Sequence, residues 1–90
     1  MKEEVKKVIG ETDVEGYKAN YCVIKAEEGY GVGISEVSPE NVTRGDYVRD
    51  IFSTEKEAER FAGIMARNGV LSDSLRDILR DYFAEKVLSA

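Results

Sequence analysis

The spacing of apolar residues changes once along the chain, near residue 53, and this change limits the fold more than any other feature of the sequence. Residues 4–52 hold nearly all of the β-branched and aromatic residues that alternate with other residues, as in strands. Residues 54–88 carry apolar residues at helical spacing. Strands followed by helices predict an α+β fold, an antiparallel β-meander of three to four strands followed by two C-terminal α-helices packed on one face of the sheet.

The length of 90 residues supports one domain, residues 1–90, with a modest core. We expect the strands within residues 3–52 and the helices at about 54–68 and 72–88. A loop with the only proline, Pro39, precedes the last strand, residues 46–52. The first and last strands mix charged and apolar residues, as edge strands do.

Two central strands are predicted within residues 20–34, joined at residues 27–29 with Gly29 at positive φ. The pairing that fits this loop places Ala26 opposite Tyr30 and Ile24 opposite Val32. It predicts a core face made of Cys22, Ile24, Ala26, Tyr30, Val32 and Ile34. The helices are expected to cover this face.

The same pairing places Tyr21, Val23 and Val37 on the second face of the sheet, beside glycines. Aromatic and branched side chains there can simply cover exposed glycine backbone. The face is nevertheless more apolar than a lone small domain needs. We therefore interpret Tyr21, Val23 and Val37 as a possible interaction face for a second subunit or another protein.

Helix ends are marked by local signals. Thr54 and Glu57 form a capping box at the start of the first helix, and Gly69 ends it with Val70 folding back onto Met65. Ser72 is expected to cap the second helix. The predicted apolar stripes are Ala58, Phe61, Ala62, Ile64 and Met65 in the first helix, and Leu75, Ile78, Leu79, Tyr82, Phe83 and Val87 in the second.

Acidic residues recur every four positions in the second helix and form a column of Asp73, Asp77, Asp81 and Glu85. Arg76 and Arg80 are expected to pair with Asp73 and Asp77 at three-residue spacing. The column is interpreted as a solvated face or as a docking surface for a basic partner.

The chain has no histidine and a single cysteine, Cys22, which excludes hydrolases of the Ser-His-Asp and Cys-His types. Cys22 is expected to be a buried core residue with a raised thiol pKa. No catalytic motif, metal site or cofactor site is predicted. The net charge of −5 and the lack of a basic cluster argue against a nucleic-acid partner. No signal peptide or membrane-spanning run is present, so we expect a cytoplasmic protein without a membrane partner.

Two functions remain open from the residues. The first is a non-enzymatic protein-interaction or regulatory module that acts as a homodimer or on another protein. The alternative is a small-molecule-binding or catalytic domain with a site between sheet and helices that uses Tyr82, Arg76 or Asp50. Tyrosine and arginine side chains are the only support for the alternative.

From about Gly29 onward the chain resembles a family of short uncharacterised proteins, a domain of unknown function found chiefly in anaerobic Gram-positive bacteria. The resemblance rests on the stretches at residues 30–34, 48–53, 68–70 and 75–83. It implies no known activity, ligand or catalytic residue.

Overall fold

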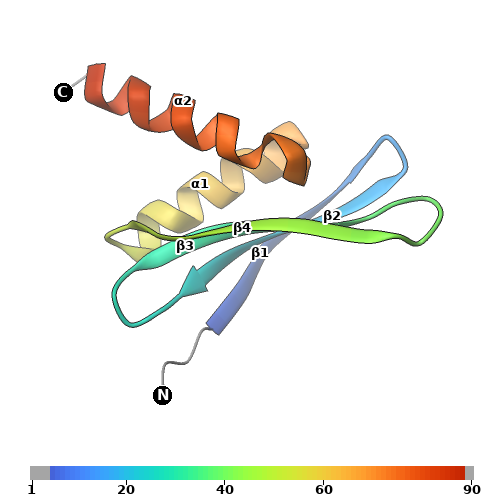
Figure 1. Cartoon of the computed structure of the whole chain (residues 1–90), viewed down its shortest axis with the longest axis horizontal. Coiled ribbons are helices and arrows are strands. Elements are labelled where there is room, and N and C mark those ends of the chain that lie inside the picture. The colour runs from blue at the N-terminus through green and yellow to red at the C-terminus, as the bar shows by residue number, and fades with distance from the viewer. Residues whose placement is uncertain (1–4, 89–90) are drawn as a thin grey trace.

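The computed structural model describes the backbone of residues 5–88 and the side chains of residues 5–85. It contains one antiparallel sheet with the strand order β1-β2-β3-β4, followed by helices on one side of that sheet (Figure 1). The predicted α+β fold is confirmed. The elements are β1 (Val5–Val14), β2 (Tyr17–Lys25), β3 (Tyr30–Val37), β4 (Thr43–Phe52), α1 (Glu55–Asn68), a 3₁₀ turn (Ser72–Ser74) and α2 (Leu75–Leu88).

β1 and β2 form a hairpin with a two-residue turn at Glu15 and Gly16. Both residues have positive φ, 50° and 87°, as in the turn type that matches the twist of paired strands. Glu4, where the alternating pattern begins in the sequence, lies outside the described residues. The hairpin places β1 at one edge of the sheet and leaves β2 and β3 in the centre.

The pairing of β2 with β3 differs by one residue from the prediction. Val23 lies opposite Val32, where the prediction placed Ile24. The connection spans residues 26–29, one residue more than expected, and Gly29 lacks the predicted positive φ. A one-residue slip moves every side chain of a strand to the other face, so the two predicted faces of β2 are exchanged.

Tyr21 and Val23 therefore belong to the core, with 0% and 1% of their surface exposed. The Tyr21 hydroxyl donates a hydrogen bond of 2.7 Å to the Val70 carbonyl, which follows α1. The prediction of an interaction face formed by Tyr21, Val23 and Val37 is wrong, because two of these three side chains face the helices. Val37, which pairs with Lys18, stays on the opposite face of the sheet.

The face of the sheet away from the helices carries Cys22 and Ile24, which the prediction placed in the core. Both are buried nonetheless. Tyr47 of β4 lies across Gly33 on this face, so close that a Cβ at Gly33 would come within 2.1 Å of the ring. The Lys6 ammonium lies 4.4 Å from the centre of the Tyr47 ring, a cation–π contact. Tyr47 and Lys6 thus shield part of the face that the helices leave open.

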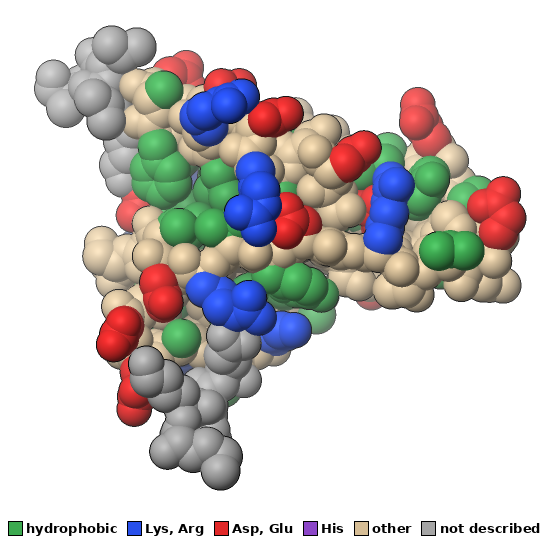
Figure 2. All heavy atoms as spheres, viewed as in Figure 1, with side chains coloured by type: hydrophobic (Ala, Val, Ile, Leu, Met, Phe, Trp, Pro, Cys, Tyr) green, Lys and Arg blue, Asp and Glu red, His purple; other side chains and the backbone are tan. Residues whose placement is uncertain are grey.

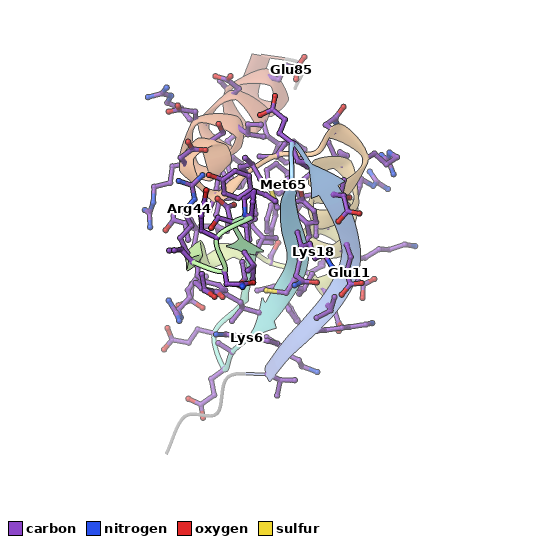
Figure 3. The ribbon with its side chains drawn as sticks, turned by 90° about the vertical axis from the view of Figure 1, so that its right-hand side faces the viewer. Lys6, Glu11, Lys18, Arg44, Met65 and Glu85 are labelled. Carbon is purple, nitrogen blue, oxygen red and sulfur yellow. The ribbon has the colours of Figure 1, made fainter. Side chains whose placement is uncertain are left out.

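α1 begins and ends where its capping signals predict. The Thr54 hydroxyl accepts a hydrogen bond of 3.2 Å from the Glu57 N–H. At the other end Gly69 has φ 61°, and the Val70 N–H donates to the Met65 carbonyl at 3.2 Å. Figure 3 shows Met65 in the interior, between the helices and the sheet. The buried stripe of the helix consists of Ala58, Phe61, Ala62 and Met65.

The start of α2 differs from the prediction that Ser72 caps it. The chain first makes the 3₁₀ turn, which no side-chain hydroxyl caps. The Ser72 N–H instead donates to Glu36 of β3 at 2.6 Å. The Glu36 carboxylate is fully buried and also accepts a hydrogen bond from Arg44 of β4. The buried Glu36 carboxylate therefore connects the beginning of α2 to β3 and β4 through hydrogen bonds.

β4 is the second outer strand and begins at Thr43, three residues before the predicted start. The loop with Pro39 precedes it as predicted. The pairing with β3 is irregular between Tyr30 and Val32, and on β4 Asp50 adopts a positive φ of 56° near this point. Neither helix of the described chain has the length and apolar character needed to cross a membrane.

Candidate functional site: a groove between β4 and α2

The two helices relate to the sheet in different ways. α1 packs closely on β1, β2 and β3. α2 starts close to the sheet, at the turn that Glu36 holds, and rises away from it toward its C-terminal end (Figure 1). A groove lies between α2 and β4.

The groove has a volume of about 230 Å³ and a mostly apolar lining. Figure 2 shows hydrophobic side chains gathered at the surface between α2 and the sheet, with Lys and Arg side chains beside them. β4 contributes two of the apolar side chains and α2 contributes the other two together with both arginines. The lining consists of Val48, Ile51, Leu79 and Phe83, with Arg76 and Arg80 at the rim.

An aromatic cluster holds the wall of the groove in place. The Phe83 ring lies 5.5 Å from the Phe52 ring and 5.5 Å from the Tyr82 ring, measured between centres. Tyr82 in turn packs edge-on against Phe61 of α1 at 5.0 Å. Such aromatic pairs add about 0.5–1.5 kcal/mol each beyond the area they bury. Phe83 is therefore packed against other rings on one side and lines the groove, partly exposed, on the other.

The two rim arginines are held differently. Arg76 makes two hydrogen bonds to Asp46 of β4, at 2.8 and 3.0 Å, which lower the pKa of the Asp46 carboxyl and raise the pKa of Arg76. Arg80 makes one contact of 3.2 Å to Asp77, and both of these side chains are more than two-thirds exposed. An exposed pair of this kind contributes about 0–1 kcal/mol, so water or a partner can displace it readily.

The predicted acidic column is exposed along its whole length. Asp77, Asp81 and Glu85 lie on α2, whereas Asp73 lies in the preceding 3₁₀ turn. The expected pair of Arg80 with Asp77 forms, but Arg76 binds Asp46 rather than Asp73. Arg76 makes this tertiary contact because β4 brings the Asp46 carboxylate within hydrogen-bonding distance of two of its nitrogens. None of the column residues lines the groove.

The residues predicted for a small-molecule site do not converge. Arg76 lines the groove, Tyr82 packs within the aromatic cluster, and Asp50 is an exposed residue of β4 outside the lining. Within residues 5–85 no group of three or more Cys, Asp and Glu side chains could hold a metal ion. Cys22 is 8% exposed, and burial raises its thiol pKa as expected.

A second hollow of about 480 Å³ lies beside the β1–β2 hairpin. Its polar lining includes Glu11, Asp13, Lys18 and Asn20, and it also contains Val37. The three charged side chains are exposed, so solvent screens them. The lining of this hollow is about as polar as it is apolar, whereas ligand sites are mostly apolar.

The groove is not among the sites that the sequence pattern predicts. Phe83 and Leu79 were assigned to the core stripe of α2, and Val48 and Ile51 to an edge strand. The available signal is the width of that stripe, since Phe83 lies at its margin beside Arg76 and Arg80. Glu36 was also missed, because a single acid in an alternating strand gives no sign that it is buried.

Comparison of the chain with protein-family models, curated proteins and solved structures finds no match. The groove must therefore be interpreted from its own geometry.

Proposed function

We propose that the chain is a non-enzymatic protein-interaction module that receives part of a partner protein in the groove between β4 and α2. The observation that carries the proposal is the apolar groove wall formed by Val48, Ile51, Leu79 and Phe83 at the surface of a small acidic domain. Apolar and aromatic side chains at a surface, bordered by polar residues, match the make-up of the core and rim of a protein interface.

The size of the groove favours a partner's side chains over a cofactor. Sites for small molecules usually enclose about 300–1,000 Å³ and contain several inward-pointing polar groups. This groove measures about 230 Å³, and among the residues whose side chains are described its charged lining residues are the two arginines at the rim. One or two apolar side chains from another protein match that volume better than a metabolite with many polar groups.

The rim also supports an interaction role. Arginine is enriched at protein interfaces because its planar guanidinium binds carboxylates and packs on apolar surface. Arg76 and Arg80 lie one helical turn apart on the flank of α2 that borders the groove. Phe83 supplies the aromatic anchor that such interfaces commonly contain.

Site-specific photo-cross-linking in cells that naturally make the protein tests this proposal. A benzophenone amino acid replaces Ile51 in the groove or, as a matched control, Val42, which is 61% exposed in the loop before β4. We expect a discrete adduct from position 51 and none from position 42. The adduct protein, once purified, should bind the wild type and lose affinity for Val48→Lys. Equal adducts from both positions, or none from position 51, would contradict the proposal.

A further inference from the structure

The charges around the groove differ from those on the rest of the surface. The chain carries a net charge of −5, but the charged residues that line the groove are both arginines. The acidic residues Asp77, Asp81 and Glu85 lie on other flanks of α2 and stay outside the lining. The charged groups that line the groove are therefore guanidinium groups, each with an aspartate partner outside the lining, Asp46 for Arg76 and Asp77 for Arg80.

The two arginines are not equally available. Arg76 is engaged by two hydrogen bonds to Asp46, and it also reaches the Tyr47 carbonyl at 3.4 Å. Arg80 has 76% of its side chain exposed, and its ion pair among residues 5–85 is with the exposed Asp77. A carboxylate of a partner can bind Arg80 because it displaces only the weak, exposed Arg80–Asp77 pair. Arg80 is thus the residue that would bind a negatively charged group of the partner, whereas Arg76 stays bound to Asp46 at the rim of the groove.

β4 does not offer a free backbone at this point. The Tyr47 N–H donates to Asp46 at 3.0 Å, and its carbonyl accepts from Arg76. An extended segment cannot extend the sheet through these groups while the Asp46–Arg76 pair is intact. Binding in the groove must then use the side chains of the partner. One apolar side chain would contact the four apolar lining residues, and a negatively charged side chain would contact Arg80.

From these observations we infer that the occupant of the groove is a short acidic segment of another protein, with one or two large apolar side chains flanked by carboxylates. The inference rests on the proposed function and specifies its partner. Apolar contact provides burial, and Arg80 selects the charge of the residues beside it. The acidic side of α2 repels the same segment from other positions, which fixes where it binds.

Fluorescence anisotropy with labelled hexapeptides tests the inference. The probe is Glu-Asp-Leu-Phe-Asp-Glu, compared with the neutral Gln-Asn-Leu-Phe-Asn-Gln, the basic Lys-Arg-Leu-Phe-Arg-Lys and the acidic Glu-Asp-Gly-Gly-Asp-Glu. We expect the probe to bind at least about tenfold tighter than each of the others at low salt. The advantage over the neutral peptide should shrink at high salt, because exposed charges are screened.

Arg80→Glu is expected to weaken binding of the probe at least about fivefold. Arg60→Glu, an equal charge reversal at an exposed position of α1, is the control and should bind as the wild type does. Circular dichroism confirms that both variants are folded. Equal effects of the two reversals, or no binding of the probe at about 1 mM, would overturn the inference.

Two other results would also overturn it while sparing the proposed function. Neutral or basic peptides that bind as tightly as the probe, and lose affinity in Val48→Lys, would keep the groove as a docking site without acidic selectivity. Concentration-dependent dimerisation of the wild type in sedimentation velocity, lost in Arg80→Glu, would assign the groove to a second copy of this chain.

Discussion

Asp46 of β4 accepts two hydrogen bonds from the Arg76 guanidinium of α2, from Nε at 2.8 Å and from a terminal nitrogen at 3.0 Å. The same two side chains bind the backbone of Tyr47, whose N–H donates to Asp46 and whose carbonyl accepts from Arg76. β4 is an outer strand, and the free edge of such a strand is open to pairing with another chain. The pair therefore blocks the middle of this edge against strand addition.

Arg76→Ala is expected to increase self-association more than it decreases stability. The substitution uncovers the Tyr47 carbonyl and leaves Asp46 without its cation, but the Arg76 side chain is two-thirds exposed, so the pair contributes only about 0.5–1 kcal/mol to the free energy of unfolding. Light scattering during prolonged incubation should show faster growth of assemblies than in the wild type. Arg80→Ala, one turn further along α2, is the control and should behave as the wild type does. Identical scattering from both variants would exclude the blocking role.

The Asp46–Arg76 pair also predicts a specific dependence of stability on pH. The hydrogen bond from Arg76 lowers the pKa of Asp46 in the folded chain. A carboxyl group with a lowered folded pKa stabilises the fold above its unfolded pKa, about 4. This contribution is lost as the pH falls through the folded pKa.

Urea unfolding of the wild type and Asp46→Asn at pH 7 and near pH 2.5 measures this contribution. The other carboxyl groups titrate in both proteins, so the difference between the two free energies of unfolding isolates Asp46. We expect the wild type to be the more stable protein at pH 7 and the difference to shrink at the lower pH. If the difference in free energy of unfolding were the same at both pH values, the contribution of Asp46 to stability would not depend on its charge.

Substitution of Glu36 and substitution of Arg44 are expected to reduce stability by different amounts. The Glu36 side chain is 0% exposed, whereas the Arg44 side chain is 45% exposed. Removing Arg44 leaves a buried carboxylate without its counter-ion, and breaking a buried pair in this way costs about 3 kcal/mol or more. Glu36→Gln leaves an arginine that water can reach, and we expect a cost of about 1–2 kcal/mol.

The comparison uses Arg44→Met, which keeps an unbranched apolar side chain near the Tyr17 ring, 5.1 Å from the guanidinium in the wild type. Urea unfolding at pH 7 gives both free energies. Arg44→Met should be the less stable variant. The opposite order would mean that packing of the two side chains, and not burial of the Glu36 charge, determines the stability of this contact.

The fold class and the ends of α1 were predictable because their signals are local. Thr54 and Gly69 each fix a helix end through bonds to residues a few positions away. The faces of β2 were not predictable in the same way. Both faces of this strand are apolar, Tyr21 and Val23 on one side and Cys22 and Ile24 on the other, so the sequence pattern fits either pairing with β3.

The groove could not be predicted from local sequence signals either, but for a different reason. It joins Ile51 of β4 to Phe83 of α2, and the angle of α2 determines whether their side chains meet over a core or border an open groove. The start of α2 is tied to β3 by the hydrogen bond from Ser72 to the buried Glu36. Neither the burial of Glu36 nor the choice of Asp46 by Arg76 follows from spacing along the chain.

Cys22 provides a test of how well the open face of the sheet is covered. Its thiol is 8% exposed, and burial raises its pKa, although the Lys6 charge and a backbone hydrogen bond from Gly33 act in the opposite direction. The reactive thiolate is therefore both scarce and shielded at neutral pH. An aromatic disulfide reagent at pH 7.5 should label the native chain at least about 100-fold more slowly than the chain unfolded in urea.

Val8→Ala tests whether β1 contributes to this cover. Val8 lies opposite Cys22 on the open face and is itself 60% exposed, so its truncation removes little buried surface but widens access to the thiol. We expect faster labelling of native Val8→Ala with an unchanged urea midpoint, and the wild-type rate in Val42→Ala, an equal truncation in the loop before β4. Rapid labelling of the native wild type would contradict the burial of Cys22. Equal rates in all three proteins would show that the reagent reaches the thiol only after the sheet opens.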